Sequence, residues 1–268
     1  MIITSKIQKK STANNYLSIL SQLNRQFDNR DLKTITSDEA LAFLTQFNNG
    51  TKQTTKRLRY SLLNAFFNLI KNSLDETIPN PCDTIMLRKL FRNSRGVQRS
   101  IHEKETVDEM IFKTECIRNR LLLELMARGG MRIGEFLKTR TMDVENIKII
   151  LHNPKSGREV EFVFIPQKVA DRLKEYIRLN NIGNEQRIFP LSYGGARAIV
   201  KKAGRIVGID LSPHDLRRHA ATYASRSGTP IEIVSKVILR HGNLSTTQRY
   251  LGKVSDVEAA RWIENLYG

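Results

Sequence analysis

The stretch NIKIILHNPKSGREVEFVFIP, residues 146–166, differs in character from the rest of the chain. Its two outer runs, NIKIILH and EVEFVFIP, are rich in β-branched and aromatic residues and read as strands. The segment NPKSGR between them carries the proline, serine and glycine of a turn. The stretch therefore predicts an antiparallel hairpin with Lys155 at its tip. Such a lysine is commonly solvated, although its long stem also lets the ammonium group reach a bound polyanion.

The residues on the N-terminal side of this hairpin predict a small bundle of helices. Thr36 with Glu39 three positions later forms a capping box at a helix start. Two other helices are expected from apolar side chains at helical spacing. The two stripes are Tyr16, Leu20, Leu23 and Phe27, and Leu58, Leu62, Phe66 and Leu69.

On the C-terminal side the helices continue. RNRLLLELMARGG, residues 118–130, predicts a buried helix that ends at a glycine pair, and MRIGEFLKTR restarts a short helix. Further helix starts are expected at Gln167, Ser192, Pro213, Pro230 and Ser255. The predicted fold class is mainly α with a small antiparallel β-sheet.

Composition shifts predict a domain boundary before residue 101. Residues before a proline avoid the helical region, so IPNPCD at 78–83 ends the first run of helices, and one short helix follows at about 84–92. FRNSRGVQRS, residues 91–100, has three arginines and no acid. We therefore expect a helical DNA-binding domain at 1–93, a basic linker at 94–100 and a mixed α/β domain at 101–268.

The net charge is the strongest compositional signal. The 268 residues include 44 Lys and Arg against 27 Asp and Glu, a net charge of +17. A protein this basic is expected to bind nucleic acid. An anionic membrane is the alternative, but it would favour basic residues gathered on one amphipathic helix, whereas here both halves are positive. Candidate DNA contacts are Lys52, Lys56, Arg59, Arg92, Arg95 and Arg99.

Several classes of site have no support in the sequence. There is no apolar run long enough to span a membrane, no secretory signal and no phosphate-binding GxxxxGK[ST] loop. IHEKET at 101–106 departs from the zinc motif HExxH at Thr106, and no tight acidic cluster suggests a two-metal nuclease. We therefore expect no cofactor, no metal and no small-molecule substrate. The cytoplasm is the expected compartment, with nucleoid association if the source is prokaryotic.

Six polar residues stand out in chain order. Tyr250 and His241 lie within LRHGNLSTTQRYLG, residues 239–252, among polar and turn-forming neighbours. The other four are Arg132, Lys155, His214 and Arg217. Each has an ordinary alternative when taken alone. Arg132 after two glycines is either a phosphate ligand or an exposed helix-start arginine, and His214 with Arg217 is commonly a surface pair. Glu135 is expected to cap or to pair locally.

Taken together, these residues and their order resemble the catalytic set of the tyrosine recombinases, the phage integrase family. GMRIGEFLKTR resembles the first-arginine motif, and PKSGREVEFVFIP the hairpin that carries the lysine. PHDLRRHAATYA resembles the His-x-x-Arg box, and LRHGNLSTTQRYL the box with the second histidine and the tyrosine. The resemblance is strong over 101–268 and weaker over 1–93. Arg240 stands where glycine often precedes that histidine, and Gly242 where serine is frequent, which puts the local loop shape in doubt.

The resemblance implies a site-specific DNA recombinase or integrase. Tyr250 would attack a phosphodiester and form a 3′-phosphotyrosine link, while Arg132 and Arg217 hold the phosphate oxygens. Lys155 would protonate the leaving 5′-oxygen, His214 would handle the phenolic proton and His241 would donate to the phosphate. The implied partners are duplex DNA, enclosed by the two domains, and other copies of the chain in a tetramer.

Three questions stay open at this point. A type IB topoisomerase-like relaxing enzyme shares the same chemistry, and a non-catalytic DNA-binding protein would use the six residues only as phosphate contacts. The C-terminal segment SDVEAARWIENLYG, residues 255–268, either packs on its own domain or docks on a neighbouring protomer. The resemblance favours docking on a neighbour.

Overall fold

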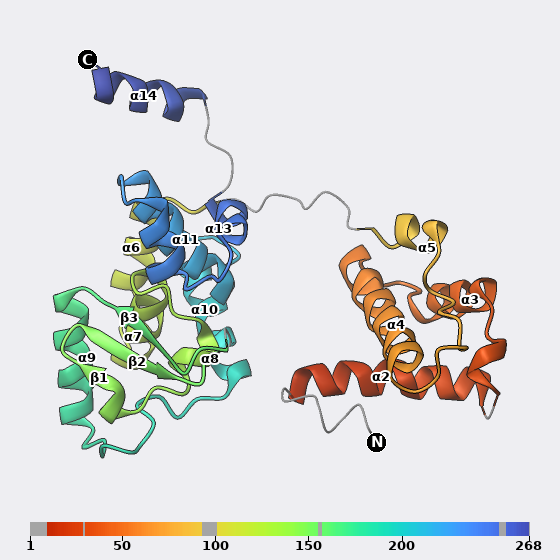
Figure 1. Ribbon diagram of the computed structural model, residues 1–268. Helices are drawn as coiled ribbons and strands as arrows, with labels where there is room; N and C mark the ends of the chain where they lie inside the picture. The colour runs from red at the N-terminus through yellow and green to blue at the C-terminus, as the bar shows by residue number, and fades with distance from the viewer. Residues whose placement is uncertain (1–9, 29, 93–100, 155–156, 252–255, 268) are drawn as a thin grey trace. The chain divides into compact units, whose positions relative to one another are not determined.

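The structure is a computed structural model that describes residues 10–28, 30–92, 101–154, 157–251 and 256–267 (Figure 1). The chain divides into two compact units, Met1–Val97 and Gln98–Gly268. The predicted linker at 94–100, with Arg95 and Arg99, lies outside the described residues. Each unit is therefore considered by itself.

The first unit is built from helices. They are α2 (Lys10–Phe27), the 3-10 turn η1 (Leu32–Thr34), α3 (Ser37–Phe47), α4 (Gln53–Ser73) and α5 (Ile85–Leu90). The predicted capping box is confirmed at the start of α3. The Thr36 side chain accepts from the Glu39 backbone N–H, and the Glu39 carboxylate accepts from the Thr36 backbone N–H at 2.9 Å.

The core of the first unit corrects one of the predicted stripes. On α4 the buried side chains are Tyr60, Leu63, Phe67 and Ile70. Leu58 and Leu69 are exposed, so the stripe that began at Leu58 is wrong. Leu62 and Phe66 lie at the edge of the core, only partly buried. Because α4 is apolar around much of its circumference, more than one stripe fits its sequence, and only packing against α2 and α3 selects the buried one.

The second unit combines helices with one small sheet. Its elements are α6 (Lys104–Phe112), α7 (Ile117–Ala127), α8 (Ile133–Phe136), η2 (Thr141–Asp143), β1 (Val144–Glu145), β2 (Lys148–His152), β3 (Val160–Phe164), α9 (Gln167–Leu179), α10 (Tyr193–Ile206), α11 (Pro213–Arg226), α12 (Ile231–Ile233), the π-helix η3 (Val234–Ile238), α13 (Leu244–Leu251) and α14 (Asp256–Tyr267). The predicted helix starts at Gln167 and Pro213 are confirmed, and Ser192 is the N-cap of α10. Ser255 lies outside the described residues.

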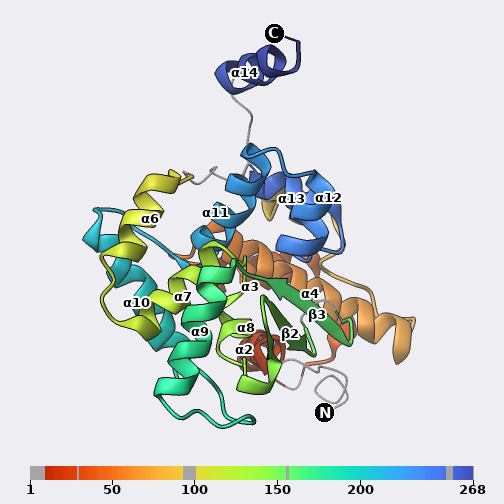
Figure 2. The ribbon, with the colours of Figure 1, turned by 90° about the vertical axis from the view of Figure 1, so that its left-hand side faces the viewer.

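The sheet has the order β1-β2-β3 (Figure 1) and is antiparallel throughout. Figure 2 shows β2 and β3 from another side. The predicted hairpin strands pair with Ile150 opposite Phe162. On one face Ile149, Leu151 and Val163 are buried in the main core together with α7, whereas Phe162 on the other face is exposed. This alternation follows from the two-residue period of a strand. The predicted fold class, mainly α with a small antiparallel sheet, is confirmed.

Two packing relations prepare the site. Helix α7 lies in the core and packs against α11, and α11 also packs against α13 and η3. The turn after α7, the start of α11 and the loop after η3 therefore come together although they are far apart in sequence. None of the helices that the structure describes is both long enough and apolar enough to cross a lipid bilayer.

Candidate active site

Arg132 is held at the start of α8 by a turn that only glycine fits. Gly130 has φ +61°, and a Cβ there would lie 2.8 Å from the Ile238 carbonyl oxygen. A Cβ on Gly129 would lie 2.9 Å from the Ile165 side chain. The glycine pair thus lets the α7–α8 turn approach both the end of η3 and the end of β3 closely. Arg132 then follows as the N-cap residue of α8.

Arg217 is placed by the first turns of α11. Pro213 occupies the first helical position, and Ser212 donates through its backbone N–H and its hydroxyl to the Asp215 carboxylate, at 2.9 and 2.5 Å. This cap fixes the helix start. His214 is exposed one turn before Arg217, and Arg217 is only 1% exposed.

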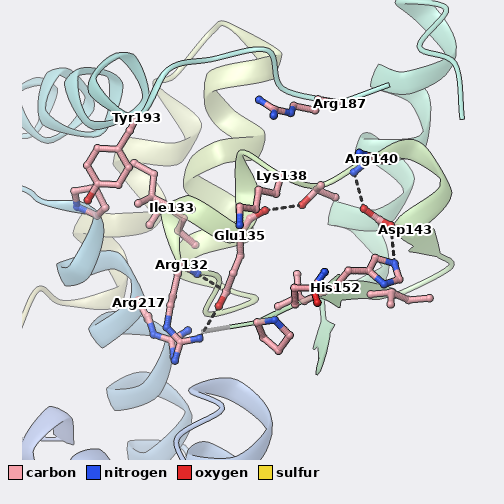
Figure 3. A pocket seen from close by; sticks show the side chains of 18 of the residues that line it. Arg132, Ile133, Glu135, Lys138, Arg140, Asp143, His152, Arg187, Tyr193 and Arg217 are labelled. Carbon is pink, nitrogen blue, oxygen red and sulfur yellow. Dashed lines mark hydrogen bonds and ion pairs between the residues drawn. The ribbon is translucent and has the colours of Figure 1, made fainter. Parts of the chain in front are cut away.

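The two arginines converge on the same backbone carbonyl. Arg217 donates to the carbonyl oxygens of Gly130 and Leu239, and Arg132 donates to the Leu239 carbonyl at 3.4 Å. Figure 3 shows the two guanidinium groups side by side at one end of a pocket. Their fixed forks fit the geometry of a phosphate, which two arginines can grip from two sides.

Glu135 orients Arg132 through two hydrogen bonds. Its carboxylate accepts from the Arg132 guanidinium at 2.5 Å and from the Arg132 backbone N–H at 2.7 Å. Burial raises the pKa of Glu135, but Arg240 and Arg132 outweigh burial and hold that pKa below its usual value. The local capping and pairing role expected for Glu135 is thus confirmed.

His241 is oriented by two buried hydroxyls. Its backbone N–H donates to the Ser235 carbonyl at 2.9 Å, and its Nδ1 lies 3.0 Å from Thr247 Oγ1. Thr247 Oγ1 lies 2.9 Å from Ser235 Oγ, and both side chains are buried. Burial, together with the positive charges of Arg217, Arg132 and Arg240, lowers the pKa of His241 to about 4. A neutral imidazole next to several guanidinium groups marks a strongly positive site suited to an anion.

The side chains of Arg132, Glu135 and Arg217 border a cavity of about 860 Å³ in the second unit. Arg132, His214 and Arg217 line it, and the hairpin turn contributes Asn153 and Pro154 to the wall. Lys138, Arg140 and Arg187 line the pocket away from the arginine pair, with Tyr193 above Ile133 in Figure 3. His152 lies 3.1 Å from the buried Asp143 carboxylate in the same wall. The wall of the cavity thus carries several cationic side chains, which suits an anionic ligand.

Comparison with known proteins identifies this arrangement. The family model "Phage integrase family" matches residues 96–255, which include the whole cavity. The chain belongs to the phage integrase family. A tyrosine recombinase of Thermosipho africanus (strain TCF52B) is 31% identical over 261 residues, which cover 89% of this chain and 86% of that protein. This phage integrase family member is thus a tyrosine recombinase, a site-specific recombination enzyme.

Solved structures share the fold of this tyrosine recombinase. A Tn1549 transposon integrase in complex with transposon right end DNA has a TM-score of 0.74 and 16% identity, and covers all of this chain and 97% of its own. A lambda integrase dimer bound to a core site has a TM-score of 0.72 and 19% identity, and covers 94% and 92% of the two chains. At this identity the likeness concerns the fold.

The predicted site residues divide into three groups in this recombinase. Arg132, His214 and Arg217 share one cavity, and His241 lies close enough for Arg217 and Arg132 to shift its pKa. The backbone of Tyr250 lies in α13, but its side chain is outside the description, as is all of Lys155. Their roles stay predictions. The predicted DNA contacts Lys52, Lys56, Arg59 and Arg92 belong to the first unit.

Sequence reasoning missed the part of Arg240, which it treated only as an unusual loop residue. The side chain is 3% exposed and donates to Glu135. It also missed Arg187 and Tyr193, which reach the cavity from segments that carry none of the recognised motifs. An arginine in place of the expected glycine was the available signal for Arg240, whereas nothing local marks Arg187.

Proposed function

We propose that this recombinase cuts and rejoins duplex DNA by transesterification through a 3′-phosphotyrosine at Tyr250. The observation that supports this best is the convergence of Arg132 and Arg217 on the Leu239 carbonyl, beside His214 and next to His241. Two fixed guanidinium groups at one end of a cavity form a binding site for a single backbone phosphate.

The arginines lower the barrier by stabilising charge. Negative charge accumulates on the non-bridging oxygens as the phosphorus is attacked, and preorganised cations in a desolvated site stabilise that charge strongly. Arg217 is buried and its carbonyl partners fix its orientation, so it loses little entropy when the phosphate binds.

The proton movements balance in both directions. The Tyr250 phenol has an ordinary pKa of about 10, so it needs a base, and His214 takes its proton as the Oη–P bond forms. The P–O5′ bond breaks, and Lys155 gives the leaving 5′-oxygen its proton. His241 donates a hydrogen bond to the phosphate. Rejoining reverses these steps, so one phosphoester bond is exchanged for another.

The first unit, as the helical DNA-binding domain at 1–93, supplies further phosphate contacts. Lys52 is exposed at the start of α4 and Arg92 is exposed after α5, and both are suited to reach a DNA backbone. Lys56 belongs to the same proposal, as do Arg95 and Arg99, which lie outside the described residues. These contacts give affinity and salt dependence more than sequence specificity.

Recombination on DNA also implies assembly. Among the structural neighbours, lambda integrase is described as a dimer bound to a core site and as a tetramer bound to a Holliday junction. We extend this to a homo-tetramer on duplex DNA for the present chain, acting in the cytoplasm. Helix α14, whose Trp262 and Ile263 side chains are exposed, is the segment proposed to dock on a neighbouring protomer.

The decisive experiment traps the covalent intermediate. The protein is incubated with a nicked cognate duplex. Because cleavage next to the nick releases a short fragment that diffuses away, the strand cannot be rejoined and the covalent adduct accumulates. Adducts are resolved on a denaturing gel. Wild type is expected to form an adduct and Tyr250→Phe none, whereas Tyr176→Phe, in the distant α9, is expected to behave as wild type. An adduct that persists in Tyr250→Phe would reassign the nucleophile.

The same protein separates the two alternatives. Efficient relaxation of supercoiled plasmid without a specific site would indicate a type IB topoisomerase-like enzyme. Tight, salt-dependent binding with no adduct on any substrate would indicate a non-catalytic DNA-binding protein. The cognate site is obtained by crosslinking the protein to DNA and sequencing what is recovered.

A further inference from the structure

Arg240 adopts a backbone conformation that its side chain does not favour. It has φ +49°, in the left-handed region, immediately before His241. Residues with a Cβ enter this region at a cost, and glycine does not. The side chain is also 3% exposed, although burying a guanidinium group is unfavourable unless it is well paired. Two costs at one position call for a compensating role.

The Arg240 guanidinium joins three separate elements. One nitrogen, Nη1, donates to the Ile238 carbonyl at 2.9 Å, at the end of η3. The other, Nη2, donates to the Gly130 carbonyl at 3.1 Å and to the Glu135 carboxylate at 2.7 Å. Its Nε lies 3.6 Å from the Glu161 carboxylate on β3.

These partners are also the partners of the phosphate-binding arginines. Glu135 pairs with Arg132, and the Gly130 carbonyl accepts from Arg217. Arg240 therefore contacts one hydrogen-bond acceptor of Arg132 and one of Arg217. It also directly precedes His241 in the chain. Its guanidinium group faces two backbone carbonyls and the carboxylates of Glu135 and Glu161, and Arg240 is not among the residues that line the cavity.

We propose that Arg240 is a positioning residue: it holds the side chains of Arg132, Arg217 and His241 in the relative positions needed to bind one phosphate. Through Glu161 it also ties this group to β3, the strand that follows the predicted Lys155. The inference rests on the proposed cleavage reaction and adds a residue that acts through its neighbours.

The charges around Glu135 give this proposal a specific signature. Arg132 faces the carboxylate from its own helix start and Arg240 from the turn after η3, while Glu161 of β3 and Arg217 of α11 contact the same network. Burial raises the pKa of Glu135, whereas the charges of Arg240 and Arg132 and the hydrogen bonds from Arg132 lower it, with a net result below the usual value. Without Arg240 the pKa of Glu135 rises, so the carboxylate takes up a proton at higher pH and releases Arg132.

Arg240→Gly separates this role from a backbone role. Glycine relieves the left-handed backbone, so a residue needed only for the turn would be replaced without loss. Asn181→Gly is the matched control, because Asn181 has φ +49° in an exposed loop outside the cavity wall. Arg240→Lys keeps the charge but lacks the fork that spans several acceptors.

The test is the single-turnover cleavage rate of the nicked duplex between pH 5.5 and 8.5, with DNA affinity measured in parallel. Arg240→Gly is expected to lower the rate about 100-fold at pH 7, the scale of a misplaced catalytic group, with affinity nearly unchanged. Its acidic limb is expected to move to higher pH. Adding Glu135→Gln to Arg240→Gly is expected to cost little more at acid pH, where Glu135 is already protonated.

Each outcome decides the matter. A wild-type rate and pH profile in Arg240→Gly, or fully additive effects of the two substitutions, would overturn the inference. If Arg240→Gly does not fold by circular dichroism, Arg240→Lys carries the test: a reduced rate with the wild-type pH profile is expected, and a wild-type rate overturns the inference. A wild-type protein that forms no adduct would instead refute the proposed function.

Discussion

The first unit keeps its charged side chains at its surface, whereas the second unit buries several of them. Among the described residues, Asn48 is the one buried polar side chain of the first unit, and it is uncharged. The buried ionisable side chains of the second unit are Glu124, Asp143, Glu161, Asp215, Arg217, His219 and Arg240. Burying charge is costly, and of these residues Arg217 and Arg240 are paired within the group around Gly130, Glu135 and Leu239 next to the cavity.

The difference matches two ways of acting on DNA. Exposed cations attract a polyanion from a distance, and salt screens their effect. Buried and hydrogen-bonded cations act over a few ångströms on one phosphate, and salt screens them much less. In the proposed reaction the first unit would therefore supply affinity and the second unit the chemistry.

Arg59 is a cation of the first unit that also makes contacts within the unit. Its guanidinium lies 3.8 Å from the centre of the Phe47 ring and donates to the Phe47 carbonyl and to Asn48 Oδ1. These contacts join α4 to the end of α3. Of the predicted DNA contacts on α4, Arg59 therefore has a structural task as well, while Lys52 is fully at the surface.

The largest effect on cleavage is expected where the orientation of a buried charge is changed but the charge itself is kept. Arg217→Lys keeps the charge but loses the fork that binds the Gly130 and Leu239 carbonyls. The cleavage rate is expected to fall about 10²- to 10³-fold, the cost of removing one preorganised donor. Arg226→Lys, at the exposed end of the same helix, is the control. A lysine variant with near-normal cleavage would break the comparison.

The next largest effect is expected at Gly130, where the turn between α7 and α8 approaches the end of η3. Gly130→Ala places a Cβ 2.8 Å from the Ile238 carbonyl at φ +61°. The free energy of unfolding of the second unit is expected to drop by about 2–4 kcal/mol, which combines left-handed strain with a steric clash. Gly134→Ala, where a Cβ meets nothing within 4 Å, should be neutral or stabilising. Equal melting temperatures for the two variants would contradict this account.

A smaller effect is expected from the hydroxyl that orients His241. Thr247→Val keeps the shape but removes the group 3.0 Å from Nδ1. Loss of one buried hydrogen bond is expected to lower the cleavage rate about tenfold. Thr246→Val, at an exposed position of the same helix, serves as the comparison and should retain the wild-type rate. The idea fails if both variants cleave alike.

The smallest expected effect on chemistry comes from the first unit. In a Lys52→Ala, Lys56→Ala double variant, DNA affinity should fall. The plot of log affinity against log salt should become less steep, its negative slope shrinking in magnitude by about 2. Cleavage at saturating DNA is expected to stay at the wild-type rate. Filter-binding titrations at several salt concentrations provide the measurement. A lower saturated rate with an unchanged slope would show that the first unit takes part in the chemistry.

Much of the second unit could be predicted from short stretches of sequence. The hairpin strands, the glycine-terminated α7 and the start of α11 at Pro213 all follow from residues close together in the chain. The Arg132, His214 and Arg217 grouping was predicted through resemblance to a family, because no local rule joins residues this far apart. The two-residue strand β1 was missed, since two residues carry no periodic signal.

The sequence by itself determined the features that depend on near neighbours: the Thr36–Glu39 cap, the start of a helix at Pro213 and the turn residues between the hairpin strands. Only the tertiary structure decided which face of α4 is buried and that Arg240 pairs with Glu135 and Glu161. Caps and turns are settled by contacts within about four residues, whereas burial and charge pairing depend on elements brought together by packing. A buried arginine is tolerated here because partners more than 70 positions away surround it.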